Sequence, residues 1–140
     1  HRSLYLFQCS YKRKQASGRT SNYYATACLV HSDRFRSVTV PVEIVPRDWT
    51  EVITSDKVDM GDSPFTEKFL ALSENPGRAR EIVNESIQSI LLEHDKKPLF
   101  NPVKVAVGPA GAVLMADRTF EHEQLQDILA LARQIEAAIE

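Results

Sequence analysis

The most distinctive group of chemically capable side chains is a cluster of cations and tyrosines near the N-terminus. The cations are Lys12, Arg13, Lys14 and Arg19, and they are flanked by Tyr11, Tyr23 and Tyr24. Cations neutralise phosphates and aromatic rings stack on unpaired bases, so the cluster has the chemistry to hold single-stranded nucleic acid. The same cations favour an anionic membrane surface. A third interpretation gives them no ligand, because such charges also solubilise a protruding hairpin.

The distribution of charge favours the membrane surface over nucleic acid. The chain carries 17 basic and 19 acidic side chains, and its sequence pI of about 6.1 is low for a dedicated nucleic-acid binder. Residues 1–36 nevertheless hold seven basic side chains and a single acidic one, Asp33. This polarity would orient the domain against an anionic partner. We therefore expect the partner to be an anionic membrane surface or an unidentified protein, and we consider nucleic acid disfavoured.

Histidines and aspartates supply the other residue types that bind metal ions or catalyse reactions. They are His31, His94, His122, Asp56, Asp59 and Asp62. The histidines are far apart and belong to no H-E-x-x-H or Cys/His pattern, and the aspartates lack the spacing and closing glutamate of an EF-hand. We predict no metal site, no cofactor and no catalytic residue. We expect His94 to lie in the last turn of a helix, charged at the negative end of the dipole or solvated.

For three further residues and for the last helix, we weigh a functional interpretation against a structural one. Trp49 is a candidate contact for a partner, or it anchors an irregular loop on the sheet. Cys9 and Cys28 are too few for a disulfide scaffold, and we expect both to be reduced and buried. The apolar stripe of the last helix is typical of a core, although it also allows a homo-oligomer.

The length and composition predict one domain. A chain of 140 residues that is 43% hydrophobic buries a substantial core. It has no run near the ~20 apolar residues of a transmembrane helix, and its N-terminus lacks the apolar core of a signal peptide. Because the first residues already have a strand-like pattern and no Met precedes them, we expect residues 1–140 to be a single domain excised from a longer chain.

Two runs of aromatic and β-branched residues predict an antiparallel hairpin with a long basic tip. These runs are residues 4–11 and 23–30. We predict a register that places Cys9 roughly opposite Tyr24 and Phe7 roughly opposite Thr26. The cations and tyrosines described above therefore belong to the tip of this hairpin.

The rest of the chain predicts further strands and two amphipathic helices. The strands are expected at residues 38–44, 69–72, 103–107 and 112–116. Pro41 places the first of these at an edge or a bulge, and residues 46–64 are predicted as mostly loop. One helix is expected from the Asn75 cap to near His94, and another follows a cap at Thr119.

The order of these elements predicts the fold class. It is strand, strand, strand, irregular segment, strand, helix, strand, strand, helix. Short connections favour antiparallel pairing, so we predict an α+β fold. It consists of a single twisted antiparallel sheet of about five to six strands with two amphipathic helices on one face.

The second half of the chain also resembles a known family. The segment before the first long helix has the pattern Phe65-x-x-x-Phe69-x-Ala71-x-Ser73-Glu74-Asn75-Pro76. With the helix, the two strands and the terminal helix that follow, residues 63–139 resemble an uncharacterised bacterial and archaeal family of membrane-anchored proteins. Ala71 departs from the β-branched residue usual there. The resemblance implies transmembrane helices upstream of His1 and no known activity, and it supplies no catalytic residue.

These observations predict a non-catalytic interaction domain of a membrane-anchored protein, on the cytoplasmic side of the membrane. One alternative is a small-ligand or enzymatic site in a pocket between the sheet and the helices, near Trp49. Another is a weak nucleic-acid-binding module that uses the basic hairpin.

Overall fold

Seven strands and four α-helices form the part of the chain that the computed structural model describes, residues 2–48, 56–97 and 103–140. The strands are β1 (Arg2–Lys14), β2 (Thr20–Ser32), β3 (Val42–Pro46), β4 (Lys57–Val58), β5 (Phe69–Leu72), β6 (Lys104–Gly108) and β7 (Gly111–Ala116). The helices are α1 (Pro64–Lys68), α2 (Pro76–Ile82), α3 (Glu85–Asp95) and α4 (His122–Ala138), and a short 3-10 helix, η1 (Asp33–Ser37), follows β2.

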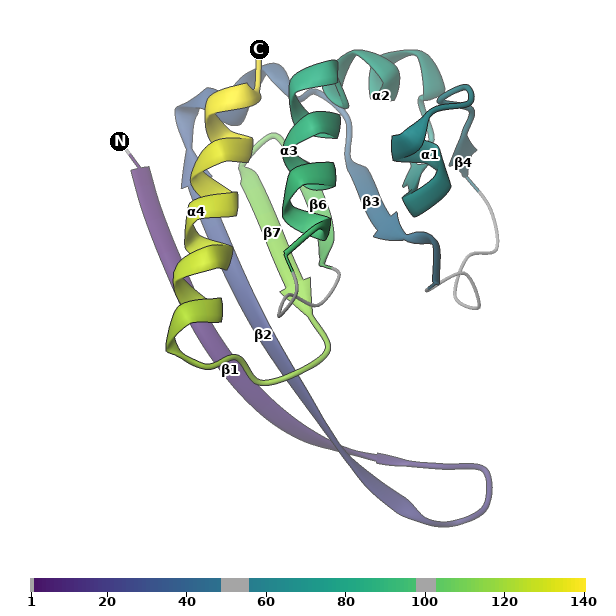
Figure 1. Cartoon of the computed structure of the whole chain (residues 1–140), viewed down its shortest axis with the longest axis vertical. Coiled ribbons are helices and arrows are strands. Elements are labelled where there is room, and N and C mark those ends of the chain that lie inside the picture. Colours follow the sequence, from purple (N-terminus) through teal and green to yellow (C-terminus); the bar gives the residue numbers. More distant parts are fainter. Residues whose placement is uncertain (1, 49–55, 98–102) are drawn as a thin grey trace.

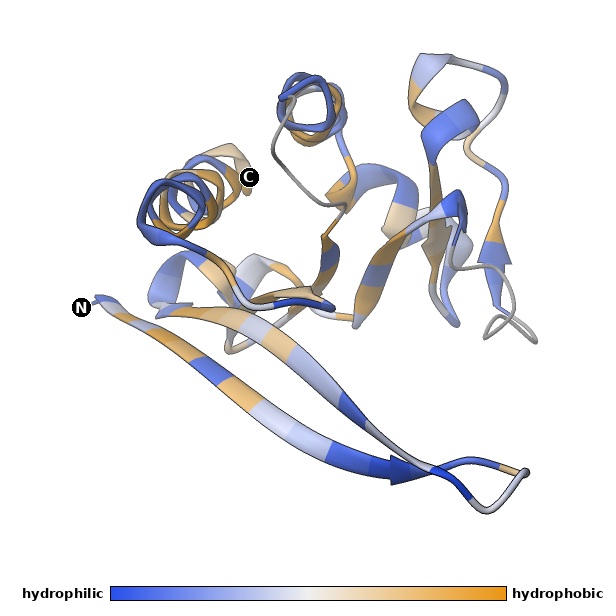
Figure 2. Ribbon diagram, turned by 60° about the horizontal axis from the view of Figure 1, so that its bottom comes forward, coloured by the Kyte–Doolittle hydropathy of each residue, from blue (hydrophilic) through white to orange (hydrophobic). Residues whose placement is uncertain are grey.

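The strands form one antiparallel sheet with the order β1-β2-β7-β6-β3-β5-β4. Helices α3 and α4 lie side by side on one face of it (Figures 1 and 2). The predicted α+β class and single antiparallel sheet are therefore correct. The predicted strand count and element order are not, because β4 is too short to leave a periodic pattern and one expected helix is divided in two.

The core lies between the sheet and these two helices. Alternate residues of the central strands, such as Val30 and Leu114, point toward the helices and are completely buried. The stripe predicted on the last helix meets them, with Ile128 and Ile135 also at 0% exposure. Each such side chain contributes about 1.5–3 kcal/mol by leaving water. The stripe of α4 is therefore part of the core.

The helix predicted to run from the Asn75 cap to near His94 is interrupted at Asn84. The Asn84 side chain accepts a hydrogen bond from the Ile87 amide at 3.0 Å and caps α3, and its Nδ2 donates to the Ala138 carbonyl at 3.0 Å. Asparagine is a strong N-cap, and this contact with the end of α4 gives it a second partner. The spacing of apolar residues in the sequence does not reveal this break, because α2 and α3 each bury a stripe of apolar side chains.

The strand that contains Pro41 is internal and not at an edge. β3 begins one residue after Pro41 and pairs with both β5 and β6. Because Pro41 precedes the ladder, its missing N–H costs the sheet no hydrogen bond. Its carbonyl accepts a hydrogen bond from the Ser73 hydroxyl at 3.0 Å. The terminal helix likewise begins later than predicted, with Glu121 as its N-cap in place of Thr119.

Candidate functional site

The turn end of the β1–β2 hairpin, residues 2–32, projects beyond the rest of the fold (Figure 1). β2 pairs with β7 only over Thr26–His31, whereas its remaining residues toward the turn pair with β1 alone. The six pairs from Cys9↔Ala25 to Lys14↔Thr20 thus form a free two-stranded ribbon. At ~3.3 Å per residue this ribbon projects about 20 Å beyond the sheet.

The register of the hairpin differs by one residue from the predicted one. Cys9 lies opposite Ala25, not Tyr24, and Phe7 lies opposite Ala27, not Thr26. The observed register pairs the two aromatic runs end to end, Leu4 with Val30 and Tyr11 with Tyr23, so the predicted partners were displaced by one residue along β2. A slip of one residue exchanges the two faces of a strand, so Tyr24 is on the opposite face from the one its predicted partner implied.

Three of the four cations at the tip, Lys12, Arg13 and Lys14, lie on β1, and the fourth, Arg19, lies in the turn. We call Lys12, Arg13, Lys14 and Arg19 the tip cluster. The strands reach Lys14 and resume at Thr20, and the turn is closed by a hydrogen bond from the Gln15 amide to the Arg19 carbonyl at 2.8 Å. Gly18 occupies the turn with a φ of +84°, which a side chain rarely tolerates. Because side chains alternate, Arg13 points to the other face from Lys12 and Lys14.

The charges of the tip cluster are available to a partner. Within the described residues, none of its four side chains forms an ion pair, whereas Arg2, Arg78 and Lys97 elsewhere do. All four are exposed. The first acidic residue of the chain, Asp33, comes after the hairpin has ended. The tip is therefore a concentrated positive charge with no internal neutralisation.

Two of the three predicted tyrosines come together next to these cations. Tyr11 lies opposite Tyr23, and their rings stack with centroids 5.5 Å apart at 17°. Tyr24 lies opposite Ser10 on the other face and is 48% exposed. The structure thus unites Tyr11 and Tyr23 with the tip cluster and separates Tyr24 from them.

Polar contacts hold the base of the hairpin to the body. Gln8 donates to the Phe120 carbonyl at 2.8 Å and to the Thr26 hydroxyl at 3.2 Å. The Thr26 hydroxyl in turn donates to the Arg118 carbonyl at 2.7 Å. An ion pair at 3.1 Å joins Arg2 to Glu136 of α4. A two-stranded hairpin by itself is only marginally stable in water. These contacts with the body therefore fix the direction in which the ribbon projects.

Helices α3 and α4 lie on one face of the sheet, so no described helix covers the other face of β1 and β2 (Figure 2). We call this the open face, and its large residues are Tyr5, Phe7 and Tyr11, which are 55%, 51% and 46% exposed. A hollow of about 480 Å³ lies beside Tyr5, between Leu29 and Val113. No functional role was predicted for Tyr5 and Phe7, although their alternation with Cys9 and Tyr11 in the sequence indicates a shared strand face.

His94 is not the charged or solvated residue that we predicted. It is 6% exposed, and burial lowers the pKa of its imidazole from 6.5 to about 4, with Lys97 adding to the effect. It lines a hollow of about 330 Å³ between α3 and α4, where Lys97 pairs with Asp127 at 3.1 Å. Its ring is therefore neutral at physiological pH and belongs to the packing of two helices.

The cysteines differ from each other. Cys28 is buried as predicted, and burial raises the pKa of its thiol to about 11, so it is not a nucleophile at neutral pH. Cys9 was predicted to be buried and is exposed, because it lies on the open face. Among the described residues, no three His, Cys, Asp or Glu side chains are placed to hold a metal ion together.

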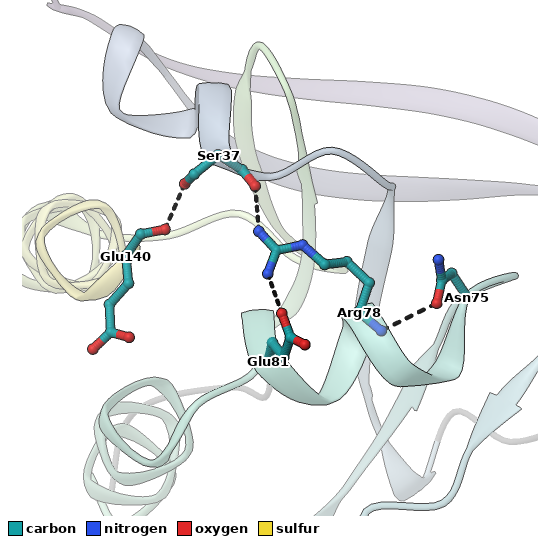
Figure 3. A network of polar contacts seen from close by, with 5 residues as sticks. All are labelled: Ser37, Asn75, Arg78, Glu81 and Glu140. Carbon is teal, nitrogen blue, oxygen red and sulfur yellow. Dashed lines mark hydrogen bonds and ion pairs between the residues drawn. The ribbon is translucent and has the colours of Figure 1, made fainter.

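A polar network near the C-terminus is structural (Figure 3). Arg78 of α2 pairs with Glu81 and donates to the Ser37 carbonyl, and the Ser37 hydroxyl donates to the Glu140 carbonyl at 2.6 Å. Asn75 caps the same helix by accepting from the Arg78 amide at 3.1 Å. These groups satisfy one another's hydrogen bonds and charges, and they join η1, α2 and the chain end. Unlike the tip cluster, they leave little charge for a ligand.

Two predictions concern the segment before α1. Trp49 lies outside the described residues, and so does the adjoining part of the predicted pocket. Asp59 accepts a hydrogen bond from the Gly61 amide at 2.9 Å, which is an ordinary turn contact. The Asp56 carbonyl accepts from the Ser73 amide at 2.9 Å.

Comparison with known proteins adds a fold likeness. No protein family and no curated protein matches the sequence. The structure is similar to the crystal structure of the mycobacterial trehalose monomycolate transport factor A, TtfA, with a TM-score of 0.59 and 16% sequence identity. The likeness covers 90% of this chain and 68% of that one. At this identity it shows a shared α+β fold. No described helix is long and apolar enough to cross a membrane.

Proposed function

We propose that this chain is a non-catalytic docking domain that binds an anionic membrane surface through the tip of its β1–β2 hairpin. The observation that carries the proposal is the tip cluster, four exposed cations that form no ion pair with any described residue, at the end of a ribbon about 20 Å long. Such a ribbon brings charge to a surface while the helices and core stay clear of it.

The tip cluster supplies a weak electrostatic attraction to an anionic membrane. Near an anionic leaflet each Lys or Arg contributes about 1 kcal/mol, so the four cations together contribute about 4 kcal/mol. Because Lys12 and Arg13 point to opposite faces, the tip presents charge on both sides and favours an end-on approach. The stacked pair of Tyr11 and Tyr23 lies just behind, where amphipathic rings suit the headgroup region.

A membrane-anchored parent protein on the cytoplasmic side fits this proposal. The cytoplasmic leaflet is the negatively charged one, and a tethered domain needs only weak additional attraction to lie against it. The fold likeness to a protein named as a trehalose monomycolate transport factor supports a binding role over a catalytic one.

The experiment is co-sedimentation with vesicles of phosphatidylcholine alone or with phosphatidylserine, at low and physiological salt. The test variant changes Lys12, Arg13, Lys14 and Arg19 to Ser. The control variant changes Arg36, Lys57, Lys68 and Lys96, which are also exposed, to Ser and loses the same charge.

We expect salt-sensitive binding to the anionic vesicles only, lost in the test variant and kept in the control. Equal loss in both variants would assign the binding to overall charge and overturn the proposal. Absence of vesicle binding together with tight binding of a single-stranded oligonucleotide would assign the tip to nucleic acid instead.

A further inference from the structure

β1 is an edge strand, and a long run of its main-chain groups has no partner among the described strands. It lies at the end of the sheet order, and its pairing with β2 is regular over all 13 residues. The Gln15 amide bonds to the Arg19 carbonyl directly across the turn. Since antiparallel pairs alternate, odd-numbered residues of β1 bond to β2, and the main-chain groups of Leu6, Gln8 and Ser10 are directed away from it.

This edge lacks the protection that natural edge strands have. Edges are normally blunted by charges, prolines, bulges or very short strands. Residues 3–11 contain no charged residue, no proline and no glycine, and the pairing shows no bulge. The large side chains of Tyr5, Phe7 and Tyr11 stand on the open face beside the edge, each about half exposed. An added strand would bury them.

Charge decides which strand fits. A second copy of β1 that pairs antiparallel with all of residues 3–11 is centred on Phe7, and this register places Arg2 opposite Lys12. Like charges directly opposite each other are destabilising. The hairpin contains no acidic side chain to relieve them. A strand with an acidic end opposite Lys12, Arg13 and Lys14 has the complementary charge.

We propose that the free edge of β1 binds an extended, acidic segment of a protein partner as an additional antiparallel strand. The N-terminal acidic residues of this segment pair with Lys12, Arg13 and Lys14. Its following alternate apolar residues lie against Tyr11, Cys9 and Phe7 on the open face. Main-chain hydrogen bonds supply affinity and the alternate side chains supply specificity.

The probe is a fluorescent peptide, Glu-Glu-Glu-Val-Thr-Val-Thr-Val-Thr, whose binding to the whole chain is followed by anisotropy. A matched peptide replaces the three Glu with Lys. The protein variant is Ser10→Pro, which removes one outward N–H and leaves the β1–β2 ladder intact, with Ser10→Ala as its control. Two further peptides are N-methylated on the threonines, which face β1 in the proposed register, or on the valines, which face away.

We expect the Lys peptide to bind about tenfold more weakly, because three cross-strand ion pairs become repulsions. Ser10→Pro and methylation of the threonines should abolish binding, whereas Ser10→Ala and methylation of the valines should not. The bound peptide should slow amide exchange at Leu6, Gln8 and Ser10. Vesicle binding by the tip cluster should survive in Ser10→Pro.

Two results would overturn this proposal. Peptide binding that is insensitive to both Ser10→Pro and threonine methylation would mean that the three Glu residues bind the cations without pairing of the peptide as a strand. A dimer of the free chain in sedimentation equilibrium, dissociated by Ser10→Pro, would assign the edge to a second copy. The methylated peptides keep the test decisive if Ser10→Pro fails to fold.

Discussion

The side chain of Gln8 donates a hydrogen bond to the main-chain carbonyl of Phe120 at 2.8 Å and so connects the middle of β1 to the segment before α4. Phe120 itself is 3% exposed in the core. The bond therefore ties the ribbon to the buried core, at the position where β2 ceases to pair with β7. The direction in which the tip cluster points depends on it.

Gln8→Ala should lower the free energy of unfolding by about 1 kcal/mol, because two hydrogen bonds are lost and the Phe120 carbonyl is left without this donor. Urea denaturation measures the change. Gln15→Ala is the control, since its bond to Ser21 is exposed near the tip and its loss should cost less than about 0.5 kcal/mol. Equal losses at the two positions would contradict the anchoring role of Gln8.

Stability should fall with decreasing pH because of His94. Above pH 6.5 its ring is neutral in both the folded and the unfolded states, and it imposes no penalty. Between pH 6.5 and about 4 the unfolded state takes up the proton first, since burial lowers the pKa in the folded state. The full loss is about 3 kcal/mol. Urea denaturation of wild type and His94→Gln at several pH values measures it, and parallel pH profiles of the two proteins would refute it.

The two cysteines should differ in reactivity toward an aromatic disulfide reagent. Cys9 is exposed, whereas Cys28 has 0% exposure and a thiol pKa of about 11. We expect one thiol to react quickly in the native protein and a second only after unfolding in urea. Cys9→Ser should remove the fast phase. A fast phase that persists in this variant would show that Cys28 is reached through a local opening of the sheet.

Gly111 should not tolerate a side chain. A Cβ atom there would collide with the Val30 carbonyl oxygen on the adjacent strand, and backbone atoms cannot move aside cheaply. We expect Gly111→Ala to destabilise the fold by more than about 2 kcal/mol. Gly77→Ala is the control, because a Cβ at that position in α2 has only Asn75 Oδ1 nearby, at 3.8 Å, and alanine favours a helix. Thermal unfolding monitored by circular dichroism compares the two.

The local pattern of the sequence predicted much of the secondary structure. The stripe of α4, the alternation of β6 and β7 and the turn between Gly108 and Gly111 depend on neighbours within a few residues, so periodicity reveals them. The break at Asn84 was missed because two short helices with aligned stripes have the same spacing as one long helix. The two-residue β4 was missed because alternation needs more residues than it has.

For the candidate site, the sequence by itself determined that four cations and two tyrosines would gather at the tip of a hairpin, because a hairpin brings its ends together whatever surrounds it. Only the tertiary structure decided the rest. The edge position of β1 depends on β7 pairing with β2 from the far end of the chain, and the internal position of β3 depends on its pairing with β5 and β6. Those pairings are chosen by contacts between residues distant in sequence, and no local pattern records them.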